Sequence, residues 1–448
     1  MTRFRSPLLA VAAALAAASP HVCALEAPES PALPAILDLD TALTILRERG
    51  LDVLTAEAAI RSAEGDLQAA GAVPNPTLSG SYGRSSFHGG CTDAAGNAVA
   101  CPGLPPAYGA SLSDNAALSD SLSGKRGLRQ DVARAALSAA RRSREDALRS
   151  LEAQVKQAFI AVLVARDALA FAEEVARSQA RAAAISRARF DNGAISEADL
   201  ARIETAKLEA DQSVDSARGT LRSARVALAF LLGVRGVVPE FDVAGGPFEK
   251  TAVPPGLVGT TRDSLLATAF ERRPDVLAAR AQVERSHASV TLAHRVRIPD
   301  VTLSLGYAQQ GTGPTAITPP TLTVGLSVPL PIFYRQRGEI TKAEADSQTQ
   351  TIALAKAQST AVSDVESAWA GWVSTKALVD RMNGALLERA KTARDLVEIQ
   401  YQKGAASLLD LLDAQRTFIA TRVEYLQDLG AYWNAVFKLE QAAGVNLR

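Results

Sequence analysis

The stretch that decides the fold is residues 401–415, Tyr-Gln-Lys-Gly-Ala-Ala-Ser-Leu-Leu-Asp-Leu-Leu-Asp-Ala-Gln. Its Gly404 is typical of a helix end, because glycine adopts the left-handed backbone of that position at little cost. Ser407 then stands where a helix cap is wanted, and Asp410 follows at capping-box spacing. Two helices joined by so short a turn are expected to fold back as an antiparallel hairpin.

The same turn occurs a second time, 211 residues earlier in the chain. Its members are Phe190, Gly193, Ser196 and Asp199, in the places of Tyr401, Gly404, Ser407 and Asp410. The match runs without gaps from 124–233 to 335–444, and 42–82 also match 265–305. A repeat of this length exceeds solenoid periods and indicates a duplicated domain half. We expect a first unit at 25–234, a crossover at 235–260 and a second unit at 261–448.

Long helices precede both turns. Residues 126–190 contain no proline and, beyond Gly127, no glycine, so this helix would reach roughly 95 Å at 1.5 Å per residue. Apolar residues recur at the spacing of a coiled-coil seam: Leu148, Leu151, Val155, Ala158, Val162, Ala165, Leu169 and Ala172. Residues 338–401 are expected to form the matching helix, with Trp369 and Trp372 packed in its seam.

Strands are predicted between the helices of each unit. Residues 302–307 and 321–330 alternate aliphatic with small polar side chains, and 77–82 repeat the pattern. The partner strand near 108–118 is weaker, because Asp114 and Asn115 interrupt it. An amphipathic soluble sheet is one interpretation. A membrane sheet is the other, and it requires oligomerisation, because outer-membrane barrels have at least eight strands and leave no edge unpaired.

The first 24 residues are interpreted as a secretory signal peptide. Arg3 and Arg5 precede a short apolar run, and Val22-Cys23-Ala24 supply small residues before a cleavage point. Lipid attachment at Cys23 is the alternative. The mature chain is therefore expected to be exported.

Composition excludes several classes of function. The 448 residues carry 48 basic and 48 acidic side chains, which argues against a nucleic-acid binder. Four histidines and three scattered cysteines argue against a bound metal or cofactor. No phosphate loop or nucleophile elbow is present, and an enzyme is not expected. Cys91 and Cys101, in a loop that the second unit lacks, are predicted to form a disulfide.

The two turn motifs resemble the duplicated hairpin-tip motif of the TolC family of outer-membrane efflux proteins, over essentially the whole mature chain. The resemblance implies a mainly helical fold in which antiparallel coiled-coil hairpins form a periplasmic tunnel. It further implies a homotrimer whose chains each give four strands to one 12-stranded barrel in the outer-membrane lipid. Such a duct is passive, and it docks on an inner-membrane pump through a periplasmic adaptor.

By motif position, the resemblance assigns Asp410 and Asp413 to the constricted periplasmic entrance. It assigns Asp199 and Tyr401, with Phe190 and Arg202 beside them, to the contacts that close it. Gly193, Ser196, Gly404 and Ser407 form the turns and caps. This sequence has Ala406 where well-known members carry a basic residue, and Arg202 or Arg416 would have to replace it.

Two short segments resemble the cobalt–zinc–cadmium branch, whose members serve heavy-metal pumps of the resistance–nodulation–division (RND) class: Pro74-Asn75-Pro76 and Gly124-Lys125-Arg126. Multidrug or solvent efflux and type I protein secretion are the alternatives within the family. A periplasmic coiled-coil scaffold, which would share the helices but not the strands, is the alternative outside it.

Overall fold

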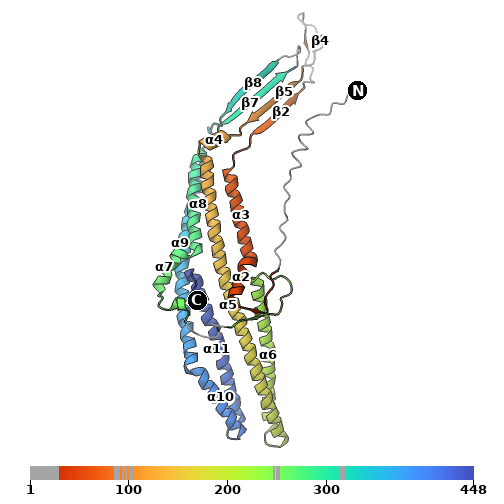
Figure 1. Cartoon of the computed structure of the whole chain (residues 1–448), viewed down its shortest axis with the longest axis vertical. Helices are drawn as coiled ribbons and strands as arrows, with labels where there is room; N and C mark the ends of the chain where they lie inside the picture. Colours follow the sequence, from red (N-terminus) through yellow and green to blue (C-terminus); the bar gives the residue numbers. More distant parts are fainter. Residues whose placement is uncertain are drawn as a thin grey trace, which may run out of the picture.

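The computed structural model describes residues 30–84, 91, 92, 95, 98, 99, 105–245, 248, 253–311 and 318–447. The predicted signal peptide with Cys23, the side chain of Cys91 and the whole of Cys101 lie outside this part of the chain, so the signal and the disulfide stay predictions. The molecule is elongated, with a sheet at one end and two helical hairpins at the other (Figure 1).

The sheet has four antiparallel strands in the order β2-β5-β7-β8, two from each unit. They are β2 (Thr77–Gly83), β5 (Ala107–Ser113), β7 (Thr302–Gln310) and β8 (Thr318–Ser327). β5 ends earlier than predicted, because the Asp114 carboxylate accepts hydrogen bonds from the backbone N–H groups of Ala116, Leu118 and Leu303 and so turns the chain. A small antiparallel hairpin follows β2, in which two strands of two residues each, β3 (Cys91–Thr92) and β4 (Ala98–Val99), pair with each other.

The register of the sheet places its apolar side chains on one face. Leu78 pairs with Leu112, Leu112 with Leu305, and Leu305 with Val324 across the four strands. The opposite face carries serine, threonine, glycine and alanine, and the Ser79 and Ser111 hydroxyls lie 2.7 Å apart there. The large apolar side chains of the first face are all exposed: Leu78, Tyr82, Tyr108, Leu112, Leu303, Leu305, Tyr307, Leu322, Val324 and Leu326.

Helices of the first unit run from the middle of the molecule to both ends. They are α2 (Leu39–Arg49), α3 (Leu51–Gly71), α4 (Ala117–Leu122), α5 (Lys125–Asp191) and α6 (Glu197–Leu231). α5 is one uninterrupted helix of 67 residues, as its sequence predicts, and it packs along α3, α6, α8 and α11.

The second unit repeats this plan with one difference. Its helices are α7 (Arg262–Arg272), α8 (Pro274–Val296), α9 (Arg337–Arg381), α10 (Leu387–Gln402) and α11 (Leu408–Ala443). The chain is helical throughout residues 337–402, as predicted, but a π-helical turn, η4 (Met382–Leu386), interrupts the regular α-helix between α9 and α10. Gly384 lies in η4 where the first unit has Glu173, and glycine weakens a regular α-helix.

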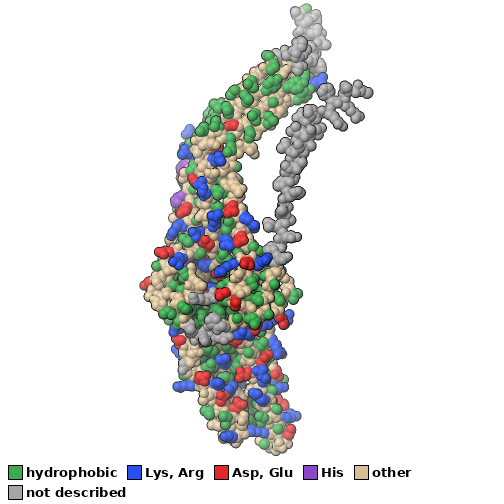
Figure 2. Space-filling view, in the orientation of Figure 1, with side chains coloured by type: hydrophobic (Ala, Val, Ile, Leu, Met, Phe, Trp, Pro, Cys, Tyr) green, Lys and Arg blue, Asp and Glu red, His purple; other side chains and the backbone are tan. Residues whose placement is uncertain are grey.

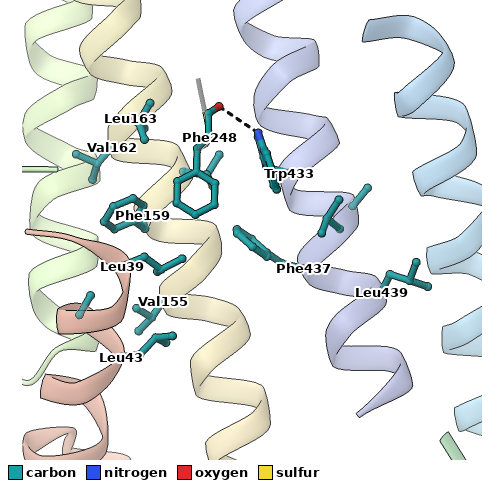
Figure 3. Packing of buried hydrophobic residues seen from close by; sticks show 14 of the residues in the cluster. Leu39, Leu43, Val155, Phe159, Val162, Leu163, Phe248, Trp433, Phe437 and Leu439 are labelled. Carbon is teal, nitrogen blue, oxygen red and sulfur yellow. Dashed lines mark hydrogen bonds between the residues drawn. The ribbon is translucent and has the colours of Figure 1, made fainter. Parts of the chain in front are cut away.

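The hydrophobic core lies at mid-height of the molecule (Figure 1), and Figure 3 shows how segments from both units meet there. Phe248, from the segment between the units, packs edge-on against Phe159 of α5 and against Trp433 and Phe437 of α11. The indole Nε1 of Trp433 donates to the Phe248 carbonyl at 3.1 Å. Nearby, β1 (Ile36–Leu37) pairs in parallel with β6 (Asp242–Val243), and η2 (Pro255–Leu257) lies against the end of the chain.

Buried ion pairs connect the helices at this level. Lys156 of α5 and Glu440 of α11 are 2.6 Å apart, and the second carboxylate oxygen accepts from the backbone N–H of Leu447. Arg273, which is 1% exposed, contacts Asp275 and Asp364 at 2.7 and 2.9 Å. Burial alone would raise the pKa of Asp275, but hydrogen bonds and the charge of Arg273 outweigh it and lower that pKa. Such pairs resist separation, because an unpaired buried charge is costly.

Candidate functional site: the hairpin tips

The first hairpin tip joins α5 to α6 through a glycine turn. Gly193 has a φ of +71°, and its N–H donates to the Phe190 carbonyl, while that of Ala194 donates to the Arg189 carbonyl. Ser196 caps α6 by accepting from the backbone N–H of Asp199 at 3.1 Å. These contacts explain why the sequence turns here.

The second tip joins α10 to α11 in the same way. Gly404 has a φ of +78°, and its N–H donates to the Tyr401 carbonyl. Ser407 and Asp410 form the full capping box: Ser407 accepts from the Asp410 N–H at 3.2 Å, and the Asp410 carboxylate accepts from the Ser407 N–H at 3.0 Å. The Ser407 hydroxyl and N–H lower the pKa of Asp410, which is therefore ionised at neutral pH.

The carboxylates of the two tips differ in their surroundings. Asp410 and Asp413 are both exposed, and both lie in the first turns of α11. Asp199 instead accepts from the Ser196 hydroxyl at 2.8 Å and pairs with Arg202 at 3.4 Å. Among the described residues, Asp410 and Asp413 therefore have no ion-pair partner, whereas Asp199 at the equivalent position of the first tip is paired with Arg202.

Arg189, which the sequence did not single out, connects the two hairpins. Its guanidinium stacks over the Tyr401 ring, with the Cζ atom 4.7 Å from the ring centroid. Its Nη2 lies 3.4 Å from the carbonyl oxygens of both Tyr401 and Gln402, at the end of α10. A cation at a helix C-terminus is favoured by the helix dipole. Arg189 thus supplies a basic contact between the tips; Arg202 pairs within its own helix.

The predicted tip residues are only partly brought together. Tyr401 is buried, but its hydroxyl has no hydrogen-bond partner in the part of the chain that the structure describes, so it does not bond to Asp199. Phe190 is half-buried and contributes its carbonyl to the first turn. Arg202 and Asp413 line one groove between α6 and α11, with Arg416 also on its wall. The roles of these residues in closing an entrance stay predictions.

A groove of about 1060 Å³ extends from the tips along α5, between α6 and α11. Its walls on α5 and α6 are rich in alanine, serine and threonine, whereas its wall on α11 carries larger side chains such as Leu412, Ile419 and Val423. Gln179 and Gln415, both buried, bond to each other at 2.9 Å across its base. The two hairpins therefore pack through a narrow seam rather than through a broad core.

The sheet, at the opposite end of the molecule, is apolar where the hairpin tips are charged. β2, β5, β7 and β8 contain no charged residue, and Figure 2 shows apolar side chains over the sheet and charged ones over the helices. No helix of the described ranges is both long enough and apolar enough to cross a bilayer. Among the described residues, no three His, Cys, Asp or Glu side chains cluster as metal ligands.

A family model for outer membrane efflux proteins matches residues 42–234 and 265–445. The chain belongs to the outer membrane efflux protein family. This efflux protein is therefore a transport protein of the Gram-negative outer membrane rather than an enzyme, and the two matched segments coincide with the two repeated parts of the sequence.

Individual proteins resemble the efflux protein over most of its length. The cobalt-zinc-cadmium resistance protein CzcC of Cupriavidus metallidurans is 26% identical over 415 residues, which cover 91% of this chain and 90% of CzcC. The pyoverdine export outer membrane protein OpmQ of Pseudomonas putida is 26% identical over 388 residues, covering 85% and 80%. A crystal structure of CusC superimposes with a TM-score of 0.73 at 19% identity, over 94% of this chain and all of that one. The predicted fold of the single chain, mainly helical with a small sheet, is thereby confirmed.

Proposed function

We propose that this efflux protein is the outer-membrane channel of a tripartite RND efflux system and passively conducts heavy-metal cations. The proposal that the cargo is a heavy-metal cation rests on the similarity, over 91% of this chain, to CzcC, a cobalt-zinc-cadmium resistance protein. The exposed pair Asp410 and Asp413 supports it, because carboxylates at a narrow entrance raise the local concentration of cations.

The edges of the sheet support assembly of the chain into a ring. β2 and β8 each pair on one side only within the described sheet, and an open edge is not tolerated in lipid. The proline-free part of β8, Thr321–Ser327, matches the length of β2, Thr77–Gly83. Pairing β8 of one copy with β2 of the next would close a barrel of three chains, with apolar side chains toward lipid and small polar ones toward the lumen.

The helical part has two free edges of the same kind. α5 packs between α6 and α11, and α10 packs on α11, so α6 and α10 lie at the outer sides of the layer. Exposed apolar residues on both helices suit a contact between copies: Leu208, Val226 and Phe230 on α6, and Leu396 and Ile399 on α10. The tips at the far end would then face a periplasmic adaptor and, through it, the inner-membrane pump.

Growth of a deletion strain tests the cargo. The strain is challenged with zinc, cobalt, cadmium and copper, and with pyoverdine-type siderophores and apolar drugs, with and without a plasmid that carries the wild-type gene. We expect sensitivity to metals that the plasmid reverses. Sensitivity to drugs or a defect in siderophore export, with metal resistance intact, would assign the channel to another cargo. The mass of the purified protein in detergent tests the assembly, for which we expect three chains.

A further inference from the structure

The two units of one chain approach each other closely where α11 packs on α5. A Cβ atom added at Gly430 of α11 would lie 2.9 Å from the Val164 Cγ2 atom and 3.9 Å from the Ile160 Cγ2 atom of α5. A side chain at Gly430 would therefore push the two helices apart, so glycine is required there. The buried ion pair between Lys156 and Glu440 lies further along the same two helices.

The internal repeat places the equivalents of this contact on α6 and α9, which do not form it within one chain. At the offset of 211 residues, Gly430 corresponds to Gly219 of α6. The α9 residues that match Ile160 and Val164 are Gly371 and Thr375. Glycine weakens a helix relative to alanine, yet a Cβ added at Gly219 or Gly371 meets no neighbour within 4 Å. Within the described part of a single chain, packing therefore accounts for neither glycine.

A groove of about 740 Å³ lies along α9 at these positions, and we call it the α9 groove. α11 forms one wall, and Arg149 of α5 also lines the groove. The wall on α9 carries small side chains apart from one aspartate: Asp364, Ser367, Ala368, Gly371 and Thr375. Three of these positions match the α5 residues that contact α11, namely Lys156, Ile160 and Val164. The α9 groove is thus the place on the second unit that α11 occupies on the first.

The face of α6 that carries Gly219 has exposed apolar residues. Leu208, Val226 and Phe230 lie two or three helical turns from Gly219 and therefore share its face. They are 65%, 47% and 71% exposed, although α6 buries other apolar residues in the same chain. Figure 1 shows α6 and α9 on opposite sides of α5 and α11. A contact between this face and the α9 groove therefore requires two copies of the chain.

We propose that α6 of the neighbouring copy occupies the α9 groove, with its Gly219 against Gly371 and Thr375, so that the contact between copies repeats the contact between the two units of one chain. The inference rests on the proposed function, in which copies assemble into a ring. One part of the contact is not repeated: the equivalents of Lys156 and Glu440 are Ser367 and Ala229, which cannot form an ion pair. The contact between copies therefore depends on close packing of small and apolar side chains.

Two pairs of engineered cysteines in the full-length protein, in isolated outer membranes, test this contact. The Cβ position at Gly430 lies 4.0 Å from the Val164 Cβ atom, within the range of about 3.5–4.5 Å that a disulfide needs. The equivalent pair between copies is Gly219→Cys with Thr375→Cys. With a mild oxidant we expect this pair to join three chains into one covalent species on a non-reducing gel, and reductant to separate them. Each single variant should give no more of this species than the wild type.

The matched control is Val164→Cys with Gly430→Cys, which has the same predicted spacing but closes within one chain and should leave its mass unchanged. The inference is overturned if the control disulfide forms and Gly219→Cys with Thr375→Cys stays a single chain. If the wild type nevertheless has the mass of three chains in detergent, the ring stands and the α9 groove belongs to another occupant, such as a helix of the adaptor. A wild type with the mass of one chain would refute the proposed assembly itself.

A leucine at Gly371 gives a second measurement that does not depend on disulfide formation. Gly371→Leu should fill the α9 groove and lower the temperature at which the three chains separate in detergent. Gly127→Leu is the control, because Gly127 of α5 is also a helical glycine whose added Cβ meets no neighbour within 4 Å. Equal separation temperatures for the two leucine variants would contradict the proposed position of α6.

Discussion

Replacing Arg189 by alanine should open the entrance. The substitution removes a cation–ring contact, worth about 0.5–1 kcal/mol at a half-exposed site, and two long charge-assisted hydrogen bonds that together contribute about as much again. A loss of about 1–2 kcal/mol per chain shifts the ratio of closed to open tips roughly 5- to 30-fold. Single-channel recording in planar bilayers measures this as an increased open probability, with Arg189→Lys expected in between, since lysine keeps the charge but not the planar guanidinium.

Arg187→Ala is the matched control for this substitution. Arg187 lies two residues away, and in the described part of the chain its ion pairs are with Asp191 and Glu204 of its own hairpin, so its loss removes the same charge without separating the tips. Equal open probabilities for the Arg187 and Arg189 variants would refute the assignment of the inter-hairpin contact to Arg189.

Two further predictions concern the core and the second tip. Lys156→Met should lower the free energy of unfolding by about 3–5 kcal/mol, because the buried Glu440 carboxylate loses its cation, and the loss is measured as a lower thermal midpoint. Lys156→Met with Glu440→Leu should recover only part of this stability, because the Leu447 N–H then loses its acceptor. A double variant no more stable than the single one would contradict the pairing. Because the pKa of Asp410 is lowered, its carboxylate stays charged at every pH above the usual carboxyl pKa of 3.8, and so does the stability that the capping box adds; both are lost only as the pH falls below that value. Cation preference in bilayers should therefore be the same at pH 7 and pH 5, and loss of the preference by pH 5 would show that another group is responsible for it.

Most of this fold could be predicted from the sequence because the same order of helices, strands and turns occurs twice in the chain. The turns at Gly193 and Gly404 and the caps at Ser196 and Ser407 are local features, set by glycine conformation and short-range hydrogen bonds, and they lie where the sequence places them. The strands follow from alternation, and the register of Leu78 with Leu112 confirms which side chains share a face.

The remainder depended on contacts between segments far apart in the chain. Arg189 precedes a recognisable motif, but its partner Tyr401 is 212 residues away, and nothing local distinguishes this arginine from its exposed neighbours. One signal was available: the first motif begins Arg189-Phe190, where the second has Gln400-Tyr401. The same comparison of the two units, Gly384 against Glu173, could have located the π-helical turn in the second long helix.

The ion selectivity of the reconstituted protein tests most directly whether the second tip is the entrance of a cation-conducting channel. The reversal potential in a KCl gradient is measured for the wild type, for Asp410→Asn with Asp413→Asn, and for a control with Asp211→Asn and Asp215→Asn, two exposed carboxylates further up α6. We expect cation preference in the wild type and the control and a reversal potential closer to zero in the tip variant. A tip variant with unchanged selectivity would contradict it.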